Sequence, residues 1–184
     1  MRRPFHALTC LGTLAHHAFE VGAGVGLVFQ PWLGLPGAAA LWGVQLPAWF
    51  AATQGSDRWD RPLAFAAGMS LGGATIHYLL WPWEPRFWLP VLREAEGIPA
   101  RGLPSYNAIL WAWMAAAVVA LARETPRRAL PWGAAGVAAA LPLRTAVRHH
   151  FDWIREEARI HPTWWNRAFN EDRSGLRPSP PPTG

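Results

Sequence analysis

The sequence alternates between long apolar stretches and short charged segments. From Pro4 to Ser56 the only Asp, Glu, Lys or Arg is Glu20, and so long an uncharged stretch is typical of helices that cross a lipid bilayer. A turn is predicted within residues 30–36, where two prolines and a glycine end one helix and begin the next. The pattern predicts transmembrane spans near residues 6–29, 36–53, 62–83, 105–122 and 129–147.

The segments around the later spans are more polar. Residues 84–107 carry several charges and prolines and are predicted to cap one end of the bundle. The span 129–147 has only 15 uncharged residues before Arg144, whose side chain must then extend toward the lipid headgroups. After it, apolar side chains recur at helical spacing with charges between them, which predicts an amphipathic surface helix. These apolar positions are Val147, Phe151, Ile154 and Ala158.

The predicted fold class is therefore all-α: a polytopic integral membrane bundle of five transmembrane helices over residues 1–147, followed by a C-terminal amphipathic surface helix. Residues 148–172 are expected to form an interfacial segment that includes the Trp164-Trp165 pair, and 173–184 a disordered tail. The N-terminus resembles the start of a signal peptide, but His16, His17 and Glu20 interrupt the apolar region, so no processing is expected. We predict a prokaryotic plasma membrane as the location. Arginines on both sides leave the orientation open, with a lean to a cytoplasmic C-terminus.

Composition excludes several classes of function. The chain has 184 residues, 17 arginines and no lysine, a net charge of +5, 13 tryptophans and one cysteine. One cysteine excludes an intramolecular disulfide and a cysteine-based zinc or iron–sulfur site. The absence of lysine excludes Schiff-base chemistry and a Walker-type phosphate loop. Because the arginines are scattered between apolar blocks, we expect no nucleic-acid partner and instead an anionic membrane surface.

Glu20 is the most informative residue, because an ionisable side chain inside a span persists only where it faces a bundle interior or a cavity. His16 and His17 precede it by four and three positions and can share its helix face. The first and third spans run in the same direction, which places Glu20 roughly 20 Å and His77 roughly 22 Å along their helices. We therefore predict a shared Glu–His site. Glu84, two helical turns beyond His77, is predicted to line its mouth.

These residue types favour proton transfer. Burial and a neighbouring histidine act in opposite directions on a carboxyl group and tune it toward neutral pH. Tryptophan faces can hold a cation or a flat lipophilic molecule. We predict a membrane-embedded acid–base enzyme of the isomerase or cyclase type. It acts on a lipophilic substrate, for example an isoprenoid, in an aromatic-lined pocket, and it uses no cofactor and no metal. Its predicted catalytic residues are Glu20, His16, His17 and His77, and its predicted substrate-binding residues are Trp42, Trp49, Trp81, Trp111 and Glu84.

The spacing His16-x-x-x-Glu20 is similar to that of the sterol-isomerase-type emopamil-binding proteins. The segment Gly55-Ser56-Asp57-Arg58-Trp59 resembles one of their loops. The resemblance covers less than a tenth of the chain and implies isomerisation of a lipophilic substrate.

Three alternatives stay open at this point. The polar residues can act only as interhelical contacts, worth about 0.6 kcal/mol each, in a non-catalytic subunit of a larger membrane complex or a homo-oligomer. They can also line a proton path. His16, His17, Glu20 and His77 can instead hold a metal ion or a haem, whereas His149-His150 with Asp152 is a poor chelate because adjacent histidines on a helix diverge.

Two further patterns have structural interpretations. Gly68-x-Ser70-x-Gly72 fits the motif of a nucleophile elbow, but that motif needs a strand-to-helix turn and this serine lies within a predicted helix. Gly68, Gly72 and Gly73, and the glycines at 22, 24 and 26, are predicted to allow close helix packing. Tryptophans at predicted span ends are typical of interface belts. They are Trp32, Trp59, Trp81, Trp83 and Trp88.

Overall fold

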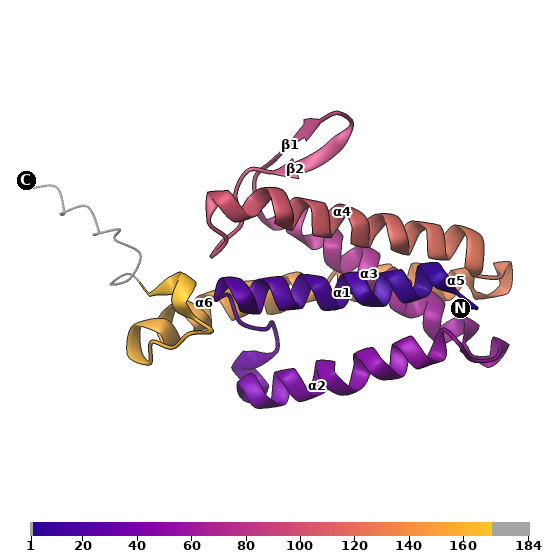
Figure 1. Ribbon diagram of the computed structural model, residues 1–184, viewed down its shortest axis with the longest axis horizontal. Helices are drawn as coiled ribbons and strands as arrows, with labels where there is room; N and C mark the ends of the chain where they lie inside the picture. Colours follow the sequence, from indigo (N-terminus) through magenta and orange to yellow (C-terminus); the bar gives the residue numbers. More distant parts are fainter. Residues whose placement is uncertain (1, 171–184) are drawn as a thin grey trace, which may run out of the picture.

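A computed structural model describes residues 2–170 of the chain, which are mostly helical. The predicted tail 173–184 and the last two residues of the predicted interfacial segment lie outside the described residues. Figure 1 shows an elongated helical bundle with a two-stranded hairpin projecting from one side. The principal helices are α1 (Pro4–Ala23), α2 (Gln30–Ala52), α3 (Asp60–Leu80), α4 (Leu103–Val119), α5 (Leu130–Ala140) and α6 (Leu143–Ile160). The strands are β1 (Trp83–Arg86) and β2 (Leu89–Leu92).

Helix α1 ends earlier than predicted, at Ala23 rather than near residue 29. Gly24 has a φ of +92° and its N–H donates to the carbonyl oxygens of Glu20 and Val21, which is a common way to end a helix. Gly26 also has a positive φ, and a Cβ at Gly22 would contact nothing within 4 Å. The prediction that these three glycines serve helix packing is therefore wrong, because two of them form the turn into α2. Helix α2 starts at Gln30 and kinks at Gly34.

Helices α3 and α5 pack with their backbones nearly in contact. A Cβ on Gly68 would lie 2.8 Å from the carbonyl carbon of Gly133, and one on Gly136 would lie 2.8 Å from Met69 N. A Cβ on Gly72 would lie 2.5 Å from the Cβ of Ala140. Close packing through Gly68 and Gly72 is thereby confirmed. Gly73 instead faces the side chain of Trp113 on α4.

The predicted fifth span, 129–147, is not one helix. Helix α5 ends at Ala140, and α6 begins at Leu143 after a turn at Leu141-Pro142. An 11-residue helix is roughly 16 Å long, about half the thickness of a bilayer's hydrocarbon core. The correction has a simple cause: Pro142 suits the first turn of a helix and interrupts an existing one. The amphipathic helix consequently starts before residue 148, with Phe151, Ile154 and Ala158 buried.

Charged side chains fix the end of the bundle that holds the N-terminus. The buried guanidinium of Arg3 lies 2.7 Å from Asp60 Oδ1, and Arg128 lies 3.2 Å from Asp60 Oδ2. Glu124 accepts the backbone N–H groups of Phe5 and His6 at 3.0 Å. A carboxylate at a helix N-terminus satisfies N–H groups that have no intrahelical acceptor. These contacts hold the start of α1 beside the end of α4.

The region predicted only as a polar cap contains the antiparallel hairpin β1–β2, in which Trp83 pairs with Leu92 and Arg86 with Leu89. Asn107 of α4 anchors it. The Asn107 side chain accepts the Leu92 N–H at 2.8 Å and donates to the Leu92 carbonyl at 3.2 Å and to the Leu103 carbonyl at 2.9 Å. Leu92 and Asn107 are both buried, so water cannot reach the backbone N–H and C=O of Leu92. The Asn107 side chain supplies the hydrogen-bond partners that a neighbouring strand would otherwise provide.

Removing this anchor is expected to destabilise the protein. Asn107→Ala leaves the buried N–H and C=O of Leu92 without partners, and an unsatisfied buried group costs about 1–3 kcal/mol. We expect the free energy of unfolding in detergent to fall by about 2–3 kcal/mol. The control is Thr75→Ala, since the exposed Thr75 hydroxyl bonds, within residues 2–170, only to the Leu71 carbonyl of its own helix. Equal stability of the two variants would contradict this role of Asn107.

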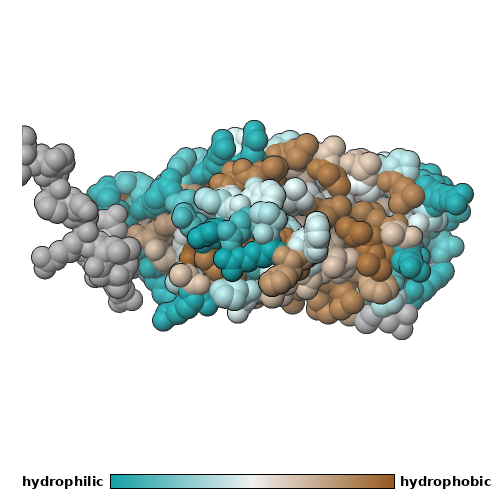
Figure 2. All heavy atoms as spheres, turned by 90° about the horizontal axis from the view of Figure 1, so that it is seen from above, coloured by the Kyte–Doolittle hydropathy of each residue, from teal (hydrophilic) through white to brown (hydrophobic). Residues whose placement is uncertain are grey.

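Among residues 2–170, two helical stretches are long and apolar enough to cross a membrane: Asp57–Leu80 and Ala100–Glu124. Helices in the core of a soluble protein also meet this criterion. Many large apolar side chains are nevertheless exposed, including Leu8, Leu14, Val44 and Val118. Figure 2 shows a broad apolar band across the bundle, interrupted by one hydrophilic patch, with hydrophilic atoms gathered toward both ends. Because the described residues are mostly helical, the fold is all-α, and two of its helical stretches are candidate spans.

Candidate functional site

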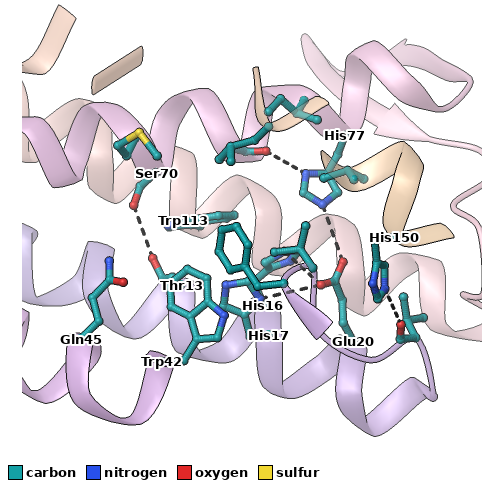
Figure 3. A pocket seen from close by; sticks show the side chains of 18 of the residues that line it. Thr13, His16, His17, Glu20, Trp42, Gln45, Ser70, His77, Trp113 and His150 are labelled. Atoms are coloured by element: carbon teal, nitrogen blue, oxygen red, sulfur yellow. Dashed lines mark hydrogen bonds and ion pairs between the residues drawn. The ribbon is translucent and has the colours of Figure 1, made fainter. Parts of the chain in front are cut away.

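A cavity of about 290 Å³ lies inside the bundle. Helices α1, α2, α3 and α6 supply most of its wall, and Trp113 of α4 completes it. Most lining side chains are apolar or aromatic. The ionisable ones lie toward the end where α1 meets α6, whereas Thr13, Gln45 and Ser70 lie farther from it (Figure 3). The polar lining residues are Thr13, His16, His17, Glu20, Gln45, Ser70, His77 and His150. The cavity therefore combines an apolar volume with one concentrated polar wall.

Glu20 lies at the centre of this polar wall. Its Oε2 is 3.4 Å from His16 Nε2 and 3.9 Å from His17 Nδ1, and its Oε1 is 3.8 Å from His77 Nε2. The Glu20 side chain is 13% exposed. The structure thus brings together all four residues predicted as catalytic. Helices α1 and α3 lie close enough for Glu20 and His77, which were predicted at similar depth, to meet.

Tyr106 is a fifth member of this group that the sequence analysis missed. Its hydroxyl donates to Glu20 Oε1 at 2.7 Å, and the side chain is 1% exposed. Tyrosine near a span end is usually part of an interface belt, so its position in the sequence gave no reason to pair it with Glu20. The depth argument applied to His77 would have found it, because α4 begins at the end of the bundle where α1 ends.

The orientation of His77 is fixed by its own helix. Its Nδ1 lies 3.0 Å from the Gly73 carbonyl and 3.2 Å from the Ala74 carbonyl. Carbonyl oxygens only accept hydrogen bonds, so Nδ1 carries the proton and Nε2 faces Glu20. In a neutral ring this Nε2 is unprotonated. A lone pair that faces a carboxylate oxygen calls for a proton or a cation between the two atoms.

Aromatic rings surround the histidines. His16 stacks on Trp113 with ring centroids 5.0 Å apart, His17 lies 4.1 Å from Trp42, and His77 lies 5.4 Å from Trp81. Trp49 lines the far part of the cavity and packs on Leu46 and Leu63. The predicted binding residues Trp42, Trp49 and Trp81 therefore lie on the cavity wall. The indole N–H groups of Trp42, Trp49 and Trp113 are buried without a protein acceptor among the described residues.

Two predicted binding residues are elsewhere. Trp111 donates its indole N–H to the Pro90 carbonyl at 2.7 Å, on the outer side of α4. Glu84 lies on β1 and pairs with Arg86 and, at 2.7 Å, with Arg93. Hydrogen bonds from Arg93 and Arg86 lower the pKa of Glu84. The prediction for Glu84 failed because it extended the face of α3 past Leu80, where the helix ends and the hairpin begins.

His150 of α6 is another cavity residue that the sequence analysis did not place there. Its Nε2 donates to the Val25 carbonyl at 2.9 Å, and its Nδ1 has no partner among the described residues. Burial lowers the pKa of His150, against the opposing effect of the hydrogen bond to Val25. The ring is therefore neutral at pH 7 and ties the α1–α2 turn to the surface helix.

This lowered pKa predicts a stability that depends on pH. A free histidine titrates near 6.5, so below that pH the unfolded chain binds a proton that folded His150 does not take up. The stabilisation is complete above about pH 6.5 and declines as the pH falls below it. We expect the melting temperature in detergent to drop less between pH 7.5 and 5.5 in His150→Gln than in the wild type. The exposed neighbour provides the control His149→Gln, and an equal change in both variants would contradict the assignment.

Ser70 lies inside α3, as predicted, and on the cavity wall. Its hydroxyl is 3.4 Å from the Thr13 hydroxyl (Figure 3). With neither a strand-to-helix turn nor a hydrogen bond to a histidine among the described residues, it lacks the surroundings of an activated nucleophile.

The same group has ligand atoms suited to a metal ion. His16, His17 and Glu20 offer three atoms that all lie within 4.8 Å of one another. A haem between His16 and His77 does not fit, because the two rings touch edge to face with centroids 4.8 Å apart, which leaves no room for a porphyrin between them.

Comparison of the chain with models of known protein families, with curated proteins and with solved structures finds no match. The similarity to emopamil-binding proteins therefore rests on the spacing of His16 and Glu20 and on the segment 55–59 alone. Function must be argued from the site.

Proposed function

We propose that the bundle is embedded in a membrane, with α1 to α4 crossing it and the shorter α5 entering part way beside α3. The exposed apolar side chains of α1, α2 and α4 support this placement, since such a surface is costly in water. The charged groups at the bundle ends suit the two headgroup regions. A prokaryotic plasma membrane and a homo-oligomer or larger complex stay predictions.

We further propose that the chain is an acid–base enzyme acting on a lipophilic substrate, of the isomerase or cyclase type. One observation carries this proposal: a carboxyl group contacted by three histidines and a tyrosine forms the polar wall of an aromatic cavity. Interhelical contacts alone need no cavity, so the cavity favours an enzyme over a purely structural subunit. Its volume, about 290 Å³, is near the lower end of ligand pockets, about 300–1,000 Å³, and suits one part of a longer molecule.

In the proposed reaction the protonated Glu20 carboxyl donates its proton to a carbon–carbon double bond of the substrate. The π electrons form the new C–H bond, and the adjacent carbon becomes a carbocation that the faces of Trp42 and Trp113 stabilise. Loss of a proton from a neighbouring carbon to Glu20 then forms the shifted double bond, or a ring after attack by a second double bond. Tyr106 holds the Glu20 carboxyl group in place through its hydrogen bond. The Glu20 carboxyl exchanges its proton through Nε2 of His77.

This reaction has a signature that does not require knowing the substrate. In D₂O the acidic proton of Glu20 exchanges with solvent, so each turnover places deuterium on a carbon from which it does not wash out. The purified protein would be incubated in D₂O with a neutral-lipid extract of the expression host and the lipids analysed by mass spectrometry. We expect time-dependent deuterium in one class of lipid. Labelling no greater than with heat-inactivated protein would contradict the proposal.

A second candidate function is a metal centre, favoured by the convergence of His16, His17 and Glu20. Ligand atoms bound at about 2.0–2.1 Å to a tetrahedral Zn²⁺ lie roughly 3.4 Å apart, close to the 3.4 Å between His16 Nε2 and Glu20 Oε2. Elemental analysis of protein purified without chelators tests it. About one zinc per chain, lost in His16→Ala and kept in His149→Ala, would establish this function, and a metal-free protein with deuterium transfer would reject it.

A further inference from the structure

The hairpin β1–β2 ends in an unusual turn. Arg86 pairs with Leu89, which leaves Phe87 and Trp88 as a two-residue loop, and their φ angles are +48° and +67°. Positive φ at both loop positions is typical of the type I′ turn, for which Asn-Gly is the favoured sequence because side chains with a Cβ are strained there. Two bulky aromatic residues in this conformation are unfavourable for the isolated hairpin.

The two aromatic side chains also have no partner within the described chain. Phe87 is 95% exposed and Trp88 is 100% exposed. Neither residue contributes to the core, so folding of the hairpin does not explain their presence. Strain and complete exposure at the same two positions indicate a contact outside the chain.

The position of the tip is well defined. Asn107 holds the Leu92 end of the hairpin, and Trp111 holds Pro90. Trp111 lies eight positions after Leu103, which is roughly 12 Å along α4. The hairpin therefore leans over the outer side of the candidate span Ala100–Glu124, and its tip projects away from α4 beside the middle part of the helix (Figure 1). With α4 in a bilayer, this places the tip beside the lipid rather than in the solvent beyond the headgroups.

The chemistry of the hairpin fits lipid. Arg86, next to the tip, and Arg93, directly after β2, both contact Glu84, and an arginine guanidinium can also bind the phosphate of an anionic headgroup. Long arginine side chains can reach the headgroups while neighbouring aromatic residues enter the acyl region. Leu89, next to the tip, is also exposed.

We propose that the Phe87-Trp88 tip inserts into the bilayer and anchors the hairpin laterally, a membrane contact separate from the transmembrane helices. The proposal rests on the membrane placement made under the proposed function. It predicts that the tip is shielded from water by lipid and not by another protein.

A nitroxide label on Phe87→Cys tests the proposal, in a Cys10→Ala background because Cys10 is the chain's one cysteine. Val44→Cys, on the exposed apolar side of α2, serves as the lipid reference, and Arg159→Cys, exposed on α6, as the water reference. The full chain would be reconstituted in vesicles of phosphatidylcholine and phosphatidylglycerol. Accessibility to oxygen and to a water-soluble nickel chelate is then measured by electron paramagnetic resonance.

We expect the label at position 87 to match the Val44 label, with greater access to oxygen than to nickel. Greater access to nickel, as at Arg159, would overturn the proposal, and so would shielding from both reagents, which would indicate a covering protein. If the Val44 label itself reports water, the membrane placement is wrong and both proposals fail. A lipid signal at Val44 with a water signal at 87 overturns only the hairpin proposal.

Discussion

Replacement of Glu20 by Gln is expected to reduce deuterium transfer from D₂O to lipid by about 10²–10⁴-fold, the usual contribution of a general acid–base group. The amide has nearly the shape of the carboxyl group and can still accept the Tyr106 hydroxyl, but it cannot donate and recover a proton near neutral pH. The melting temperature should therefore change little. Mass spectrometry of the lipids and thermal unfolding of the same preparation measure both effects.

Glu84→Gln is the matched control, because the Glu84 carboxylate is ion-paired outside the cavity. It should keep the wild-type rate of deuterium transfer. A contrary pattern, in which Glu20→Gln unfolds at a much lower temperature while transfer per folded molecule is unchanged, would assign Glu20 a structural role. Tyr106→Phe separates positioning from proton transfer, since it removes the hydrogen bond that positions the Glu20 carboxyl and leaves the carboxyl group itself unchanged.

Gly136→Val is expected to be strongly destabilising. Its Cβ would lie 2.8 Å from Met69 N and still closer to the Phe65 carbonyl oxygen, and both are backbone atoms of α3 that cannot move by a change of rotamer. Overpacking against side chains costs about 1–3 kcal/mol, so we expect a loss of at least about 3 kcal/mol in the free energy of unfolding. Denaturation in detergent measures it.

The same substitution at Gly43 of α2 is the control, because a Cβ there would meet nothing within 4 Å. Gly43→Val should change stability by a few tenths of a kcal/mol, as differences in helix propensity do. If the two variants unfold alike, the close approach of α3 and α5 is not a feature of the folded protein.

The sequence predicted those parts of the site that depend on regular helix geometry. His16 and His17 reach Glu20 because they precede it by four and three positions on one helix. His77 reaches Glu20 because α1 and α3 run in the same direction and place the two residues at similar depth. Gly68 and Gly72 predicted close helix packing, because small residues that recur on one face of a helix let another helix approach it.

The failures occur where helices end or where distant segments meet. Gly24, Leu80 and Pro142 end or divide predicted spans, and each termination depends on backbone conformation that hydropathy does not report. Glu84 was misplaced by extending a helix beyond such an end. His150 reaches the cavity, and Tyr106 reaches Glu20, only through tertiary packing, and no local pattern distinguishes them from interfacial residues.

The central claim is that the cavity beside Glu20 binds a lipophilic molecule, and mass spectrometry of what co-purifies with the protein tests it most directly. Gly73 lines the cavity, and a Cβ there would first meet Trp113 at 3.6 Å, so Gly73→Leu should fill the cavity without disturbing the helices. We predict about one lipophilic molecule of a single class per wild-type chain, lost in Gly73→Leu and retained in Gly43→Leu. The same mixture of lipids in equal amounts from all three proteins would contradict the account.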